Sequence, residues 1–219
     1  MKKLGILASG TKQGGGSGFE NLVNVWRAGG MPNTEIVAVA TNIYGGGVEE
    51  RAKRLGIHCW HFNHEPITAA GYQQFVRACH VDCVALSGYL KHVEGLDPRT
   101  TFNIHPAKLP SPFGGDGMHG HHVHEAVMSS YHRGEVQVSG VSMHFVTEVY
   151  DEGPVFFTIP VPIYPNDTAE TLGARVNRVE HIWQPWVTQL VVTDEIGWDG
   201  RDPTTLKVPE WYRHLRRAR

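Results

Sequence analysis

Two polar side chains suited to hydrogen bonding and proton transfer stand two positions apart near the middle of the chain. Asn103 and His105 alternate with Phe102 and Ile104, and Pro106 ends the alternation. A period of two is typical of a strand. If the apolar pair faces the core, the amide and the imidazole share the opposite face at the carboxyl end of that strand. Ligands bind at this edge of open α/β sheets, so Asn103 and His105 are candidate catalytic residues.

A carboxylate that could complete an acid–base set follows in a second segment. Residues 139–154, SGVSMHFVTEVYDEGP, predict a strand that runs into a turn with Asp151 at its tip. An amide, an imidazole and a carboxylate on neighbouring corners can stabilise an oxyanion and move protons. Taken alone, the Asn-x-His pair is more typical of a turn cap followed by a half-buried histidine than of a catalytic pair. The hypothesis therefore depends on Asp151 lying beside His105.

A glycine-rich segment near the N-terminus is a candidate anion site. Residues 11–18, TKQGGGSG, separate a short apolar run at 4–8 from an apolar-periodic segment at 19–26. A strand, a glycine loop and a helix in this order bring backbone N–H groups together at a helix N-terminus, which carries about half a positive charge. The loop matches neither the Walker A nor the dinucleotide-binding motif. A plain flexible loop is the alternative interpretation.

The remaining pattern predicts an α/β fold with a parallel, doubly wound sheet flanked by helices. Further strands are expected at 35–41, 58–62 and 83–89, with helices between them, and a helix is expected to begin near Gly120. Two extended segments follow at 136–147 and 155–163, and Pro160 and Pro162 favour an edge position for the second. Asp167 and Thr168 are expected to cap a long helix.

We expect one domain over residues 1–219, because both halves should share a single sheet. The half with the candidate anion loop is expected at about 1–100, the half with the candidate catalytic residues at about 101–192, and a solvated tail at 193–219, ending in RHLRRAR.

Composition limits the classes of function. The 219 residues are 41% hydrophobic with a formal net charge of −2, which supports a sizeable core and argues against nucleic-acid binding. No apolar run is long enough to span a membrane. The N-terminal residues MKKLGILASG are too short for a signal peptide and predict a first strand. Three cysteines without zinc-site spacing predict reduced thiols in a cytoplasmic protein.

Several segments together resemble the phosphoribosylglycinamide formyltransferases of the folate-dependent formyltransferase superfamily. They span about residues 4–192 and are FNIHPAKLP, GMHGHHVHEAV, VSMHFVTEVYDEGPV and ARVNRVEH. The resemblance implies formyl transfer from 10-formyltetrahydrofolate, a co-substrate, to the amine of glycinamide ribonucleotide in purine synthesis. It also implies a Rossmann-like, mostly parallel sheet flanked by helices, with a mixed C-terminal strand region. The phosphate-binding half would then be about 1–100, and the catalytic and folate-binding half about 101–192. The expected partners are these small molecules, with no nucleic acid, membrane or metal, in a monomer or homodimer.

The resemblance also implies roles for individual residues. Asn103, His105 and Asp151 would be catalytic, and Glu180 would contact the ribonucleotide. The substrate phosphate would lie at Gly16, Ser17 and Gly18. The folate would contact Asn103 and the main chain of the corner formed by Leu90, Lys91, His92 and Val93. Main-chain contacts tolerate side-chain change, so the side chains of Lys91 and His92 are not expected to matter individually.

Four closely spaced histidines raise a metal-binding alternative. They are His119, His121, His122 and His124. No cysteine lies nearby and no H-E-x-x-H pair is present, so the segment gives no zinc signal. Structural or exposed histidines are expected, with His119 and His121 as candidate cleft residues by resemblance.

Other functions share the same catalytic residue types. A formyltransferase acting on an amino sugar nucleotide or on methionyl-tRNA would also use Asn, His and Asp, as would a hydrolase of the formyl donor. Dependence on the glycine loop separates the ribonucleotide enzyme from the sugar enzymes. A non-catalytic folate-binding module would not need the acid–base set.

Overall fold

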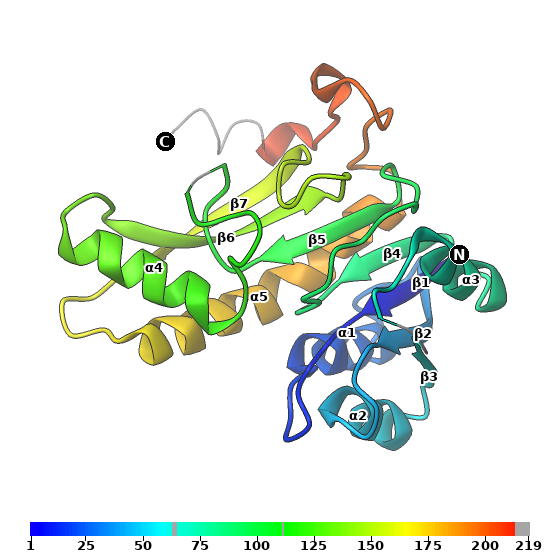
Figure 1. Ribbon diagram of the computed structural model, residues 1–219. Coiled ribbons are helices and arrows are strands. Elements are labelled where there is room, and N and C mark those ends of the chain that lie inside the picture. The colour runs from blue at the N-terminus through cyan, green and yellow to red at the C-terminus, as the bar shows by residue number, and fades with distance from the viewer. Residues whose placement is uncertain (63–64, 111, 213–219) are drawn as a thin grey trace.

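The computed structural model describes residues 1–62, 65–110 and 112–212. It contains one seven-stranded sheet in the order β3-β2-β1-β4-β5-β6-β7 (Figure 1). The strands are β1 (Lys2–Leu7), β2 (Thr34–Thr41), β3 (His58–His61), β4 (Cys83–Leu86), β5 (Thr101–His105), β6 (Val138–Phe145) and β7 (Val155–Pro162). The helices are α1 (Ser17–Arg27), α2 (Gly47–Leu55), α3 (Ala69–Ala78), α4 (His121–His132), α5 (Ala169–Val192) and the 3₁₀ turn η1 (Pro203–Thr205).

The sheet is parallel from β3 to β5, and β6 and β7 are antiparallel to their neighbours. The predicted α/β fold with a mixed C-terminal strand region is thus confirmed. β7 lies at the edge, as its two prolines predict. Because β5 pairs with β4 on one side and with β6 on the other, both halves of the chain share the sheet.

Both faces of the sheet are covered. On β1, Leu4 and Ile6 belong to a core formed with α1, α2, α4 and α5. Leu7 faces the opposite side, in a smaller core with Phe75 of α3. This alternation follows from the period of two along a strand. A parallel strand buried on both faces is expected to be nearly continuously apolar, as residues 4–8 are.

The long helix α5 carries one stripe of residues toward the edge where strands end. It begins at the predicted cap, where the Thr168 side chain accepts a hydrogen bond from the Thr171 N–H. Pro185 lies inside the helix and has no N–H for the carbonyl of His181. The Asn21 amide of α1 donates to that carbonyl instead, at 2.7 Å. This bond ties α1 to α5 close to Glu180.

Residues 194–212, expected to be solvated, instead pack against the sheet. Ile196, Val208 and Tyr212 are buried. The Tyr212 hydroxyl accepts a hydrogen bond from the Thr158 N–H at 2.6 Å. The sequence did not predict this packing, because the apolar positions of the segment are widely spaced among charged residues. The basic end RHLRRAR, 213–219, lies outside the described residues.

The state of the cysteines and the character of the helices are relevant to the cellular environment that the sequence predicts. Cys59, Cys79 and Cys83 are free thiols, and burial raises the pKa of both Cys59 and Cys83 to about 11. Thiols with such pKa values are poor nucleophiles at neutral pH. Among the described residues, none of the helices has the length and apolar character needed to cross a membrane.

Candidate active site

A cavity of about 470 Å³ opens where β1, β4 and β5 end. Its walls come from the start of α1, the corners after β4 and β5, the loop after β6, the start of α4 and one stripe of α5. Every residue predicted for the site lines this cavity: Gly16, Ser17, Gly18, Leu90, Lys91, His92, Val93, Asn103, His105, Asp151 and Glu180. The fold therefore brings together segments that are far apart in the sequence.

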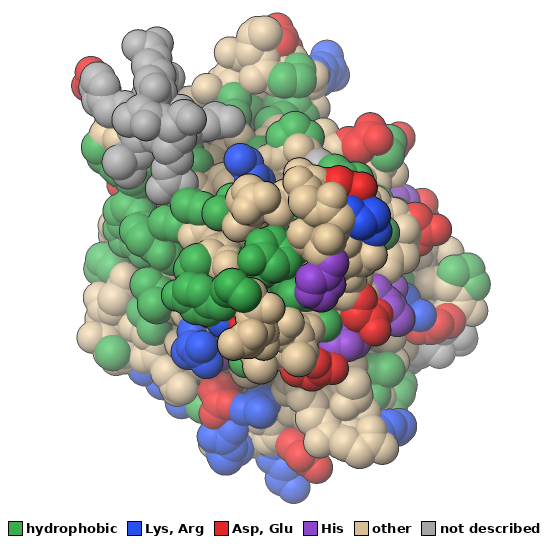
Figure 2. Space-filling view, turned by 90° about the vertical axis from the view of Figure 1, so that its left-hand side faces the viewer, with side chains coloured by type: hydrophobic (Ala, Val, Ile, Leu, Met, Phe, Trp, Pro, Cys, Tyr) green, Lys and Arg blue, Asp and Glu red, His purple; other side chains and the backbone are tan. Residues whose placement is uncertain are grey.

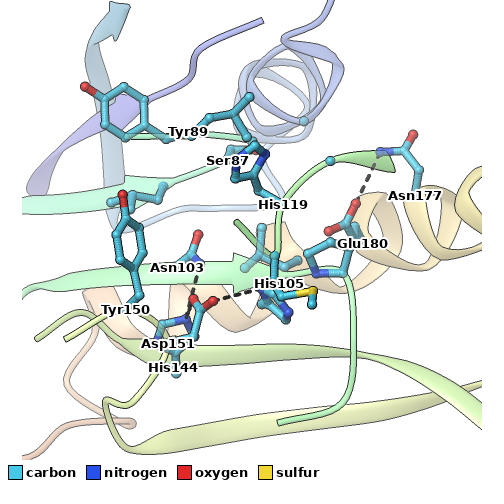
Figure 3. Close-up of a pocket in the computed structure, with 18 of the residues that line it drawn as sticks. Ser87, Tyr89, Asn103, His105, His119, His144, Tyr150, Asp151, Asn177 and Glu180 are labelled. Atoms are coloured by element: carbon cyan, nitrogen blue, oxygen red, sulfur yellow. Dashed lines mark hydrogen bonds and ion pairs between the residues drawn. The ribbon is translucent and has the colours of Figure 1, made fainter. Parts of the chain in front are cut away.

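Asn103, His144 and Asp151 form the first part of a polar cluster (Figure 3). The Asn103 Nδ2 and the Asp151 Oδ1 each lie 3.2 Å from the His144 Nε2. The His144 Nδ1 lies 2.9 Å from the carbonyl oxygen of Phe145, and a carbonyl only accepts, so Nδ1 carries a proton. Neutral His144 can then accept from Asn103 through Nε2, whereas protonated His144 can donate to Asp151. Asn103 and Asp151 thus compete for one nitrogen.

His105 is held in one orientation by its main-chain partner. Its Nε2 donates to the carbonyl oxygen of Phe113 at 2.6 Å, which leaves Nδ1 facing Asp151, 3.5 Å from Oδ2. Burial lowers the pKa of His105, while Asp151 and the Phe113 carbonyl raise it by less. Asp151 therefore raises the pKa of His105, as expected, but desolvation lowers it by more and favours the neutral imidazole.

Asp151 occupies an unusual backbone conformation at the tip of its turn. Its φ is +55°, a region that few non-glycine residues adopt and that is often found at functional sites. The Gly115 N–H donates to Oδ2 at 3.0 Å. Burial raises the pKa of Asp151, but the His144 contact, the His105 charge and the Gly115 bond outweigh it and hold the pKa below the usual value. The carboxylate is therefore ionised at neutral pH.

The D-x-G-P segment requires glycine at position 153 for a steric reason. A Cβ at Gly153 would lie 1.8 Å from the carbonyl oxygen of Phe145, so no larger residue fits. The neighbouring Pro154 carbonyl accepts a hydrogen bond from the Phe145 N–H at 3.1 Å. This tight closure returns the chain to the sheet immediately after Asp151.

The opposite end of the cavity is formed by the start of α1. Gly16 is the N-cap residue, with φ +77° and no side-chain cap. The first N–H groups of a helix lack helical partners and attract anions. A Cβ at Gly18 would lie 2.2 Å from the Ser87 Oγ, so glycine allows α1 to approach the corner after β4. Ser87 in turn donates to the buried Gln184 Oε1 at 3.1 Å.

The stripe of α5 supplies a carboxyl group between these two ends. Gly173, Asn177, Glu180 and Gln184 are spaced to share one helix face, and all line the cavity. The Asn177 Nδ2 donates to the Glu180 Oε2 at 3.3 Å, as Figure 3 shows. The Glu180 side chain keeps some surface, yet desolvation of its carboxyl group raises the pKa to about 7. Glu180 can therefore donate or accept a hydrogen bond near neutral pH.

The corner after β4, which is predicted to contact a folate, already makes several internal bonds. The Leu90 N–H donates to the Ser9 Oγ at 3.0 Å, so this donor is already used. The Lys91 Nζ lies 3.0 Å from a carboxylate oxygen of Glu65. The Lys91 ammonium group is therefore paired with this carboxylate.

The histidine segment lies beside acidic residues. Figure 2 shows histidine and acidic side chains next to one another on one face of the molecule. His121 Nε2 lies 3.5 Å from a carboxylate oxygen of Glu125 and of Glu170, and His122 Nδ1 lies 3.0 Å from Glu125. His119, His121 and His124 line the cavity. Within the described ranges, no group of three or more His, Cys, Asp or Glu side chains could hold a metal ion.

The buried His124 should make the stability of the folded protein depend on pH. It is 9% exposed, and burial lowers its pKa from the ordinary 6.5 to about 4. Below pH 6.5 the unfolded chain binds a proton that the folded protein resists, so stability falls from pH 6.5 toward pH 4. At about 1.4 kcal/mol per pKa unit, the loss approaches roughly 3 kcal/mol. In urea titrations, His124→Asn should flatten the dependence of the unfolding free energy on pH. The exposed His132→Asn on the same helix should not, and equal slopes in all three proteins would contradict this role.

Four further residues line the cavity although the sequence predicted no role for them: Ser87, His144, Asn177 and Gln184. His144 lies in the HFV segment, and the register that pairs it with Asn103 explains their contact. That register follows from the antiparallel pairing of β5 with β6, which the local pattern does not fix. For Asn177 and Gln184, the spacing from Glu180 along one helix face is a signal that the sequence contains.

Comparisons with known proteins agree with this arrangement. The family model described as "Formyl transferase" matches residues 3–188. The chain is 35% identical over 206 residues to the "Phosphoribosylglycinamide formyltransferase, chloroplastic" of Vigna unguiculata, covering 90% of this chain and 63% of that protein. It therefore spans slightly less than two thirds of that relative.

A bacterial relative and a solved structure are matched nearly end to end. The phosphoribosylglycinamide formyltransferase of Bacillus subtilis is 30% identical over 196 residues, covering 85% of this chain and 93% of that protein. The crystal structure of glycinamide ribonucleotide transformylase 1 from Symbiobacterium toebii superposes with a TM-score of 0.79 at 28% identity, covering 96% and 95% of the two chains. By sequence, fold and cavity, the chain belongs to the formyl transferase family and to its phosphoribosylglycinamide formyltransferase branch.

Proposed function

We propose that the protein transfers the formyl group of 10-formyltetrahydrofolate to the amine of glycinamide ribonucleotide. The observation that carries this proposal is the convergence of Asn103, His105 and Asp151 with the uncapped start of α1 in one cavity. An acid–base cluster suits an amine acceptor, and a helix N-terminus suits a phosphate. A single substrate with both groups at opposite ends matches this arrangement.

The acceptor would lie along the α5 side of the cavity. Its phosphate would accept hydrogen bonds from the N–H groups of residues 16–18 and from the Ser17 hydroxyl. Its ribose hydroxyls would meet Glu180 and Asn177, which lie between the phosphate end and the catalytic cluster. Its amine would then reach the side of the cavity that holds Asn103.

The donor would enter from the corner at residues 90–93, with its formyl carbon beside Asn103. Attack by the amine nitrogen forms a C–N bond and turns the formyl oxygen into an oxyanion. An amide N–H from Asn103 would stabilise this oxyanion, and removal of such donors elsewhere costs about 3 kcal/mol. The C–N10 bond then breaks, leaving the formamide product and tetrahydrofolate. The step needs no covalent intermediate and no metal ion.

One proton must move from the attacking nitrogen to N10 of the folate. The ionised Asp151 would accept it, directly or through the Nδ1 of His105, and the pair would return it to the leaving nitrogen. Because burial lowers the pKa of His105, its protonated form gives up a proton readily, which suits a general acid. The 3.5 Å separation between the two side chains supports a shared role.

We propose that the protein works in the cytoplasm as a monomer or homodimer. Three free thiols support a reducing compartment. Size-exclusion chromatography with light scattering distinguishes the two assemblies, and a higher oligomer would contradict both.

The proposed acceptor is tested by comparing substrates with a stable 10-formyl-dideazafolate donor. Glycinamide ribonucleotide should be formylated, and the same acceptor without its 5′-phosphate should lose about 100-fold in kcat/KM, equivalent to about 2.7 kcal/mol. An amino sugar nucleotide should give no product. Preference for the amino sugar would overturn the proposed acceptor. Donor binding without transfer to any amine would instead support a binding module.

A further inference from the structure

The side chain of His92 joins the donor corner to the loop that carries Asp151. Its Nε2 lies 2.8 Å from the carbonyl oxygen of Glu148, so Nε2 must carry the proton and donate. Its ring centroid lies 4.9 Å from that of Tyr150, at an interplanar angle of 53°. Glu148 and Tyr150 both lie shortly before Asp151 in the loop. One side chain therefore holds this loop at two points.

His92 is itself anchored from the other side. Its carbonyl oxygen accepts a hydrogen bond from the Tyr72 hydroxyl at 2.7 Å, and the Tyr89 hydroxyl lies 3.1 Å from that of Tyr72. A hydroxyl has one proton, so Tyr72 donates to His92 and Tyr89 donates to Tyr72. Both tyrosines are buried, and burial raises the pKa of Tyr72 to about 12, which keeps its proton in place. The core thus fixes the residue that holds the loop.

The loop that His92 contacts is exposed at Glu148 and Val149. Val149 is 53% exposed, so the loop buries little apolar surface there. The Thr147 hydroxyl donates to the Val149 carbonyl at 3.2 Å, a bond that shapes the loop without attaching it to the sheet. Asp151 must nevertheless keep φ +55° and contacts of 3.2 and 3.5 Å to two histidines. A small displacement of the loop would lengthen both contacts.

We propose that His92 is a positioning residue for formyl transfer, which holds the Asp151 carboxylate in register with the donor bound at the same corner. The proposal rests on the proposed function and goes beyond main-chain recognition by residues 90–93. It assigns the His92 side chain a role that acts through Glu148 and Tyr150.

The test compares three substitutions at this position. His92→Ala should lower kcat by about 10- to 100-fold, the scale expected when a catalytic group moves by about 1 Å. The dissociation constant of the dideazafolate donor should change less than the turnover does, because the main chain remains. His92→Gln keeps a donor of similar reach and should recover most of the activity. His92→Phe keeps a ring without a donor and should recover less.

A second measurement separates positioning from general stability. In His92→Ala the acid limb of the kcat/KM–pH profile should move to higher pH, because Asp151 loses the contacts that keep its pKa low. The exposed His58→Ala is the matched control and should leave both kcat and the profile unchanged. If the wild-type protein transfers the formyl group and His92→Ala does so at the same rate and with the same pH profile, the role of His92 is overturned and the proposed function stands. Absence of transfer by the wild-type protein would overturn the proposed function and this role together.

Discussion

Asp151→Asn is expected to lower kcat for formyl transfer by about 10²- to 10⁴-fold, the range that general acid–base groups contribute. Asparagine keeps the shape of the side chain and an oxygen that can accept the Gly115 N–H at 3.0 Å. It removes the negative charge that faces His105 and His144, and with it the group that would receive the amine proton. Initial rates at saturating donor and acceptor measure this loss, and circular dichroism checks that the protein is folded.

The matched control for Asp151→Asn is Glu152→Gln. Glu152 is the next residue, is exposed and does not line the cavity, yet its substitution removes the same charge. It should change kcat by less than about 2-fold, since isolated surface charges contribute little. Because the pKa of Asp151 lies below its usual value, the wild-type carboxylate is ionised throughout neutral pH. The loss should therefore be constant from about pH 6 to 8, and a kcat within a few fold of wild type would refute the assignment.

Gly18→Ala is expected to raise the KM for the acceptor by about 10-fold or more, equivalent to about 1.4 kcal/mol. The added Cβ would lie 2.2 Å from the Ser87 Oγ, so the start of α1 must move away from the corner after β4. The N–H groups proposed to bind the phosphate move with it. Overpacking of this kind also costs roughly 1–3 kcal/mol of stability. Steady-state kinetics at fixed donor and urea titrations measure the two effects.

A double substitution isolates the steric cause. Ser87→Ala removes the Oγ, and the next atom of that side chain, its Cβ, lies at an ordinary 3.6 Å from the place that a Cβ would take at residue 18. Ser87→Ala alone leaves the buried Gln184 Oε1 without its donor, which costs about 1–3 kcal/mol. Combined with Gly18→Ala, it should restore much of the KM. Gly14→Ala in the same loop meets no atom within 4 Å and should leave the KM unchanged. Strictly additive effects of the two substitutions would contradict the steric explanation.

Local sequence patterns predicted the strands and helices well, because side chains repeat every two residues along a strand and about every 3.6 along a helix. The apolar run at 4–8, the alternation at 102–105 and the Thr168 cap became β1, β5 and the start of α5. The two prolines placed β7 at the edge. In contrast, the packing of residues 194–212 depends on contacts with β7 and could not follow from their mixed composition.

The candidate site was predictable where one strand or loop carries the chemistry and less so where two elements meet. Asn103 and His105 follow from a single alternation, but the His144 contact requires the β5–β6 register. The Ser87–Gln184 bond requires α5 to cross the end of β4. The direction of the pKa of His105 depends on its burial, which outweighs the nearby carboxylate. Each of these is a property of tertiary packing rather than of local sequence.

Direct transfer to the amine is tested by supplying a folate donor labelled with ¹³C in its formyl group, together with glycinamide ribonucleotide. Nuclear magnetic resonance then follows the labelled carbon. The ¹³C signal should appear as a formamide bonded to the acceptor nitrogen, at a rate that falls in His105→Ala and Asp151→Asn. Appearance of the label as free formate, or transfer at an undiminished rate in both variants, would contradict acid–base catalysis of formyl transfer by this cluster.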